Sequence, residues 1–119
     1  MEKRVQIGDP GTLVLDGNEI DLFELTRVSE LRYIDETEDD HPRVSLVLGL
    51  VDEAGNGLRL HFHGVQHLSL PDASPRLWVS ELQLVDARDR GLDAIRYIAT
   101  SEDGFVCHCA DVTAAEVRR

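Results

Sequence analysis

The sequence predicts an all-β fold, a two-sheet antiparallel β-sandwich of eight or nine strands, with a small β-barrel as the alternative architecture. Three observations predict it: helical periodicity is scarce, short apolar runs alternate with polar residues, and Gly, Asp and Asn interrupt these runs. The length of 119 residues predicts a single domain, 1–119. Because 42% of the residues are hydrophobic, this domain can bury a core without metal or disulfide staples.

Three turn signals place the hairpins of this fold. Residues 16–18 are Asp-Gly-Asn, residues 55–57 are Gly-Asn-Gly and residues 101–104 are Ser-Glu-Asp-Gly, and each separates two apolar runs. Gly and Asn adopt the positive φ that a tight reversal requires, so each signal predicts a hairpin. A further strand is expected over residues 77–85, followed by a solvated turn or one short helical turn over residues 86–91.

Residues 21–34 fit either a helix or a strand. Asp21 followed by Glu24 resembles a helix capping box. Apolar residues then recur at a spacing that a helix could use: Leu22, Leu25, Val28 and Leu31. We favour a strand because a weak internal repeat relates this segment to two other segments of the sequence.

The repeat consists of three segments with the same apolar offsets. They begin at Leu25, Phe62 and Cys109, and each has apolar residues at offsets 3, 6 and 8. Strict strand alternation would place the first two on opposite faces, so a bulge or corner is expected between them, at Arg27, Gly64 and Asp111. Such corners let a strand pass from one sheet to the other.

The charge balance is strongly acidic, with 23 Asp and Glu against 12 Lys and Arg and a formal net charge of −11. This charge disfavours binding to nucleic acid and to anionic membranes. Residues 1–7 lack the apolar stretch of a signal peptide, and no apolar window is long enough to cross a bilayer. Two cysteines do not make a secreted disulfide framework, so we expect a cytoplasmic protein.

Residues 35–40 contain five carboxylates in six positions: Asp35, Glu36, Glu38, Asp39 and Asp40. The simplest interpretation is a solvated hairpin tip whose charge discourages edge-to-edge association. The functional interpretation is a partner-binding surface that attracts a basic protein. A calcium site ranks third, because the segment lacks the ligand order and terminal Glu of an EF-hand loop.

Three histidines lie close together in the sequence. His61 and His63 point to one face of a strand, and His67 could follow from the corner. Three imidazoles could hold Zn, Ni, Fe or Cu and leave one position open. Alternation gives a simpler interpretation in which Phe62 faces the core while His61 and His63 face water, so we expect no metal and no other cofactor.

Two further groups of side chains are expected in the core. Cys107 and Cys109 share a face with Phe105, so they are expected as buried thiols on the side opposite to His61 and His63. Trp78 and Tyr97 could anchor a partner, but packing is their more common role in alternating strands.

Residues 61–67, His-Phe-His-Gly-Val-Gln-His, resemble the first motif of the cupins, which are metal-binding double-sheet barrels with His-x-His followed by Glu. Here His67 stands where Glu is expected, and both the downstream glycine and the Pro-x-Gly-x-x-His second motif are missing. The likeness covers about seven residues. It implies the alternative function: a small cupin-like metal-binding protein or metal-dependent enzyme that uses His61, His63 and His67.

Residues 58–65 with Leu68 and Leu70, together with residues 82–84 and 104–109, resemble small bacterial β-rich proteins of uncharacterised function, some of which look like immunity proteins of toxin systems. The resemblance implies a binding role. The sequence has no Gly-x-Ser-x-Gly elbow, P-loop or dinucleotide fingerprint, which leaves nucleophilic and nucleotide chemistry without support. The leading hypothesis is therefore a non-enzymatic acidic domain that binds a basic protein partner, such as an immunity-type inhibitor covering the cationic active site of a toxin.

Overall fold

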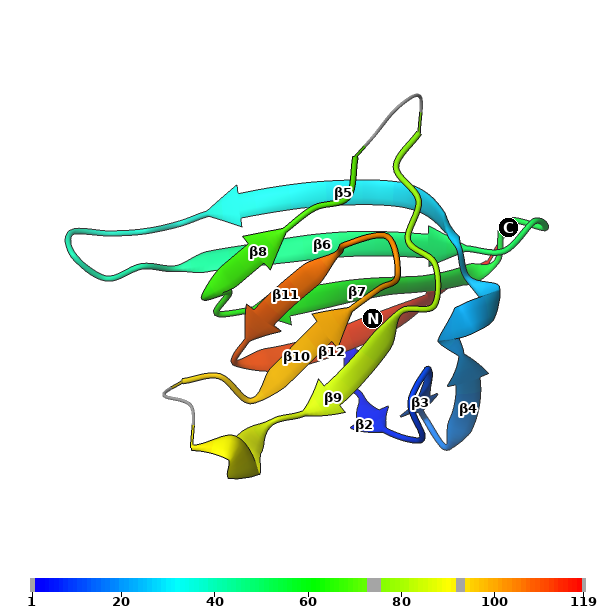
Figure 1. The fold of residues 1–119 in the computed structure, drawn as a ribbon, viewed down its shortest axis with the longest axis horizontal. Coiled ribbons are helices and arrows are strands. Elements are labelled where there is room, and N and C mark those ends of the chain that lie inside the picture. The colour runs from blue at the N-terminus through cyan, green and yellow to red at the C-terminus, as the bar shows by residue number, and fades with distance from the viewer. Residues whose placement is uncertain (1, 73–75, 92–93, 119) are drawn as a thin grey trace.

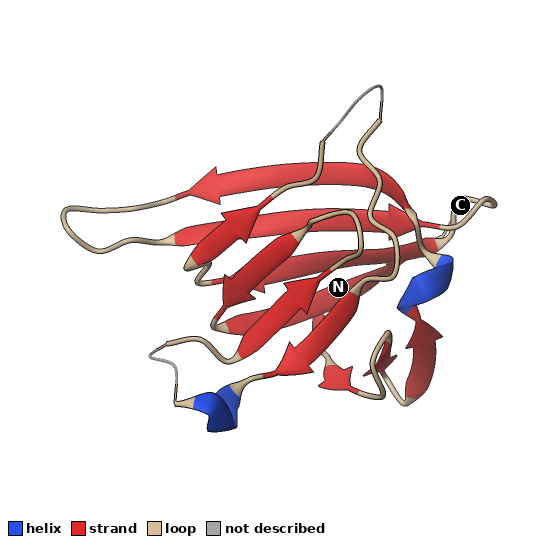
Figure 2. Cartoon of the chain, viewed as in Figure 1, coloured by secondary structure: helices blue, strands red, loops and turns tan. Residues whose placement is uncertain are grey.

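The structure is a computed structural model that describes residues 2–72, 76–91 and 94–118. Within these ranges it has twelve β-strands in three antiparallel sheets, and two 3-10 helices (Figures 1 and 2). The five-stranded sheet has the order β1 (Lys3–Arg4), β12 (Asp111–Val117), β7 (Gly57–His63), β6 (Val44–Val51) and β5 (Arg27–Asp35). The four-stranded sheet has the order β8 (His67–Ser69), β11 (Val106–Cys109), β10 (Tyr97–Thr100) and β9 (Gln83–Asp86). The three-stranded sheet has the order β2 (Gln6–Ile7), β3 (Thr12–Leu15) and β4 (Asn18–Asp21). The helices are η1 (Leu22–Glu24) and η2 (Arg88–Arg90).

The prediction of an all-β antiparallel fold is confirmed. The four-stranded sheet lies across one face of the five-stranded sheet, and the small three-stranded sheet lies at one end of the pair (Figure 1). Phe62 of β7 and Phe105, next to β11, lie in the core between the two large sheets, with ring centroids 6.1 Å apart. Among the described residues the sheets stay open, so the alternative barrel does not form. The strands outnumber the expected eight or nine because the chain ahead of β5 divides into four short strands.

All three predicted hairpin turns are confirmed. Asp16 and Gly17 have φ of 54° and 78° between β3 and β4, where an αL conformation at both positions matches the twist of the strands. Gly55 has φ of 91° between β6 and β7, and Gly104 has φ of 98° between β10 and β11. The expected short helical turn after β9 is also present as η2.

Two segments differ in part from the sequence interpretation. Over residues 21–34 both signals are correct locally: the Asp21 carboxylate accepts the Phe23 N–H at 2.9 Å and caps η1, and strand β5 begins at Arg27. The prediction of a strand over residues 77–85 is wrong for most of that range. Only β9 is regular, because Glu81 has φ of 54° and breaks the extended path just before it.

Two chain corners connect the large sheets, and both were predicted from the repeat. At Gly64 the chain leaves β7 and enters β8, and at Ala110, one residue before Asp111, it leaves β11 and enters β12. The corners are hydrogen-bonded to each other's strands: the Ala110 N–H donates to the His63 carbonyl at 2.9 Å, and the Gln66 N–H donates to the His108 carbonyl at 2.8 Å. The third expected irregularity is displaced, since the register shift of β5 lies between Val28 and Glu30 rather than at Arg27.

The buried thiols are confirmed and one aromatic prediction is wrong. Cys107 and Cys109 are fully buried, and the hydrogen bond with Cys107 together with burial raises the pKa of the Cys109 thiol, which keeps it protonated. Tyr97 packs against the core as expected. Trp78 does not, because 44% of it is exposed.

No helix in the described part of the chain is long and apolar enough to cross a membrane.

Replacing Gly64 by Ala is expected to destabilise the fold by about 2 kcal/mol or more, because Gly64 has φ of 64° and an added Cβ would lie 2.9 Å from the Cβ of Ala110. Gly17→Ala is the matched control: φ there is 78° with nothing within 4 Å of the new Cβ, so about 1 kcal/mol is expected from backbone strain alone. Urea unfolding measures both. Adding Ala110→Gly should recover the excess cost at Gly64. Equal costs at the two glycines, with no recovery, would show that the corners do not touch.

Candidate functional site

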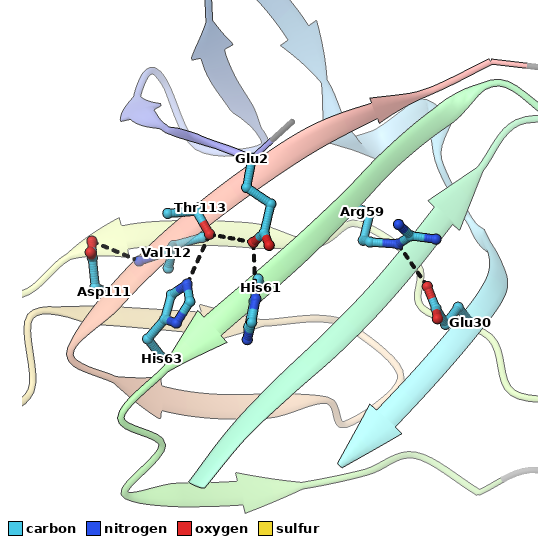
Figure 3. A network of polar contacts seen from close by, with 8 residues as sticks. All are labelled: Glu2, Glu30, Arg59, His61, His63, Asp111, Val112 and Thr113. Atoms are coloured by element: carbon cyan, nitrogen blue, oxygen red, sulfur yellow. Dashed lines mark hydrogen bonds and ion pairs between the residues drawn. The ribbon is translucent and has the colours of Figure 1, made fainter. Parts of the chain in front are cut away.

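Two histidines occupy the outer face of the five-stranded sheet, on the side away from the core. His61 and His63 alternate along β7 with the buried Phe62, and β7 is flanked by β6 and β12. Their rings stack, with centroids 3.9 Å apart and an interplanar angle of 28°. His61 lies opposite Thr113 of β12, which brings a hydroxyl to the same face (Figure 3).

The carboxylate of Glu2 completes a hydrogen-bonded chain with these groups. Glu2 directly precedes β1, which pairs with β12 in a register that places Arg4 opposite Thr113. The Thr113 hydroxyl donates to Glu2 Oε1 at 2.7 Å, and His61 Nδ1 lies 2.9 Å from the same oxygen. His63 Nε2 lies 2.8 Å from Thr113 Oγ1. Because the single hydroxyl proton is donated to Glu2, His63 Nε2 must be the donor to Thr113.

The prediction that these histidines simply face water needs correction. His61 is on the predicted face, but Glu2 and the neighbouring strands leave its side chain only 18% exposed. Its Nε2 atom is buried and has no hydrogen-bond partner, and it is the single buried side-chain nitrogen or oxygen in that condition among the residues described. A buried polar atom without a partner is rare and costly, so this atom requires an explanation.

The electrostatics of the cluster favour a carboxylate anion beside a neutral imidazole. The hydrogen bond from Thr113 and the nearby His61 hold the pKa of Glu2 below its ordinary value, although partial burial opposes this. Desolvation and the neighbouring His61 lower the pKa of His63, against the opposing effect of Glu2 and Asp111. The cluster therefore presents an ionised carboxylate beside an uncharged His63 at neutral pH.

His67 does not join this cluster. It lies on β8 in the four-stranded sheet, opposite His108, and the two rings are 5.2 Å apart. The group of potential metal ligands consists instead of Glu2, His61 and His63. Sequence reasoning missed Glu2 because it is 59 residues from His61 and no local pattern reveals that β1 pairs with β12.

The acidic segment forms the tip of the β5–β6 hairpin, which extends beyond the other strands at one end of the molecule (Figure 1). We call residues 35–40 the acidic loop. All five of its carboxylate side chains are exposed: Asp35, Glu36, Glu38, Asp39 and Asp40. A bridge between Glu38 and His41 and a φ of 52° at Asp39 define its turn. Hydrogen bonds from Thr37 lower the pKa of Asp35, so this carboxylate is charged at neutral pH.

Strand β5 adds exposed apolar side chains next to the acidic loop. Leu31 and Tyr33 are 37% and 59% exposed, although they pair with the buried Leu48 and Leu46 and share their face. At the other end of β5, Arg27 forms a bridge with Trp78, which is 44% exposed. The alternating pattern of the sequence could identify the inward face but not that this edge lies uncovered.

No protein-family model matches the chain, and comparisons with curated proteins and with solved structures find no match either. A function is therefore inferred from the structure itself, from the histidine cluster and from the exposed strand β5 with the acidic loop.

The imidazole of His63 is expected to titrate below 6.5, its ordinary value, because burial and His61 disfavour its charged form. NMR titration of the imidazole resonances measures the midpoint. His61→Gln should raise the midpoint by removing the unfavourable neighbour, and Glu2→Gln should lower it by removing the favourable one. A wild-type midpoint at or above 6.5 would contradict the burial described here.

Proposed function

We propose that this protein is a non-enzymatic domain that binds a basic protein partner through β5 and the acidic loop. The observation that carries the proposal is the position of β5: it is the edge strand of the five-stranded sheet, exposes Leu31 and Tyr33, and continues directly into the acidic loop. We call this surface the β5 edge. It combines backbone groups, apolar side chains and negative charge along one line.

The backbone of β5 can accept an added strand. β5 has nine residues, and within the described ranges the only bridge recorded on its outer side is the one between Arg27 and Trp78. The N–H and C=O groups that an edge strand leaves unpaired are available to an extended segment of another protein. An exposed edge of this length is a liability unless it is covered or repelled by charge.

The apolar side chains supply contact area at the same place. Among the described residues, Tyr33 is the most exposed large apolar side chain, and Leu31 lies two residues before it on the same face. Tyrosine is enriched at binding hot spots because it buries a large area and fixes few rotatable bonds. These two residues are expected to determine how slowly a bound partner dissociates.

The charge of the acidic loop favours binding of a basic partner over a neutral one. Its five carboxylates belong to a chain with a formal net charge of −11, which repels acidic proteins and attracts basic ones over long distances. The same charge disfavours nucleic acid as the partner. An inhibitor that covers the cationic active site of an enzyme, such as a toxin nuclease, is one form that this function could take.

The test separates electrostatic attraction from apolar contact. A partner is recovered on the immobilised protein from the extract of its native cell and identified, and its association and dissociation rates are then measured at low and high salt. Glu36→Gln, Glu38→Gln and Asp39→Asn together should slow association and weaken its salt dependence. Tyr33→Ala should instead accelerate dissociation at least about fivefold.

A matched control removes three charges elsewhere: Asp9→Asn, Glu19→Gln and Asp89→Asn, all exposed residues outside β5 and the loop. This variant should change association much less than the loop variant does. The proposal is wrong if the recovered partner is acidic, if both triple variants act equally, or if no protein is recovered.

A further inference from the structure

Three metal-ligand side chains converge on the outer face of the five-stranded sheet. One ligand atom from each of Glu2, His61 and His63 can be chosen so that all three lie within 4.8 Å of one another. Two of the side chains come from β7 and the third from the segment before β1, so the set is assembled by the fold and not by local sequence. From this convergence we propose that Glu2, His61 and His63 form a binding site for a divalent transition-metal ion, with Zn²⁺ as the expected ion.

The donor set matches the chemistry of zinc. Two imidazole nitrogens and one carboxylate oxygen are a recurring zinc donor set, and three protein ligands leave a fourth position for water or another oxygen ligand. The Thr113 hydroxyl lies 2.7 Å from the Glu2 carboxylate and 2.8 Å from His63 Nε2, so an oxygen is already present at the edge of the site. Calcium and magnesium prefer all-oxygen sites and fit this set poorly.

His61 Nδ1 faces the Glu2 carboxylate and lies 2.9 Å from its Oε1. An ion shared by Glu2 and His61 is therefore bound on the Nδ1 side of the ring, in place of the proton between these two atoms. A metal-bound histidine uses one ring nitrogen for the ion, so His61 Nε2, which is buried, carries the ring proton in the bound state.

Two of the three proposed ligands are preorganised, because they lie on a strand that is paired on both sides. β7 is paired with β6 and β12 along its whole length, which fixes the backbone positions of His61 and His63. Glu2 is 43% exposed, and its three side-chain torsions allow it to follow the ion. Binding therefore has to order little beyond Glu2, which limits its entropic cost.

Metal binding would also attach the N-terminal segment to the sheet. β1 has two residues and, among the described strands, pairs with β12 alone, whereas the proposed ligands join the residue before β1 to β7, one strand further in. This inference does not depend on the proposed function, since it concerns the opposite face from Leu31 and Tyr33 and none of the residues of the β5 edge.

The experiment titrates Zn²⁺ into the untagged full chain, freed of metal by dialysis against a chelator, with a competing colorimetric chelator as the readout. One ion per chain is expected. His61→Gln, His63→Gln and Glu2→Gln should each weaken binding at least about tenfold. The matched controls His67→Gln and His108→Gln alter the other histidine pair and should leave affinity unchanged.

A measurement on the wild-type protein covers the case in which a variant does not fold. In the imidazole NMR spectrum, stoichiometric Zn²⁺ should shift the resonances of His61 and His63 and leave those of His67 and His108 in place. The proposal is overturned if no stoichiometric zinc binds, if the His67 and His108 resonances shift instead, or if their variants lose affinity as the three ligand variants do.

Discussion

The whole arrangement depends on two corners that lie against each other, at Gly64 and Ala110. Through them β7 continues into β8 and β11 continues into β12, so both chain segments leave one sheet and join the other at the same place. Pairing is thereby kept on both sides of the turn: His63 lies opposite Asp111 in one sheet, and His67 lies opposite His108 in the other. A side chain at position 64 would collide with Ala110, which is why the close approach requires glycine.

Both candidate sites lie where the fold leaves part of the five-stranded sheet uncovered. Side chains alternate along β7, so Phe62 enters the core and His61 and His63 remain on the other face, which no second sheet covers in the described part of the chain. There the segment before β1 brings Glu2 over the histidines. At the opposite edge Tyr33 of β5 shares a face with the buried Leu46 but is itself 59% exposed, which leaves an apolar edge beside the acidic loop. The outer face of β7 therefore presents potential metal ligands, and the β5 edge presents apolar side chains and negative charge.

The sequence allowed prediction of the features that depend on local backbone chemistry. Glycines with positive φ predict the three hairpins, and the repeated apolar offsets predict a corner at Gly64 and a second corner at Asp111, one residue after its observed position at Ala110. Alternation also separated the thiols of Cys107 and Cys109 from the histidine face. These signals survive because each is determined by residues close together along the chain.

Long-range placement was not predictable in the same way. Glu2 reaches His61 through a two-residue strand that has no periodic pattern of its own. Trp78 was expected in the core, but Glu81 interrupts the strand that would have carried it inward. For Tyr33, alternation identifies the face but not the extent of the opposing sheet. In each case the surroundings of the residue depend on a segment that is distant in the sequence. The residue pattern within one strand does not identify that segment.

Residue-resolved hydrogen exchange under native conditions tests the central role of the corners most directly. The amide protons of Ala110 and Gln66 bond across the two corners, so they should exchange only through global unfolding, as slowly as that of Leu60 in β7, which is paired on both sides. Exchange of Ala110 and Gln66 at the rate of the exposed turn amide of Gly17, while Leu60 stays protected, would show that the corners open independently and do not hold the two sheets together.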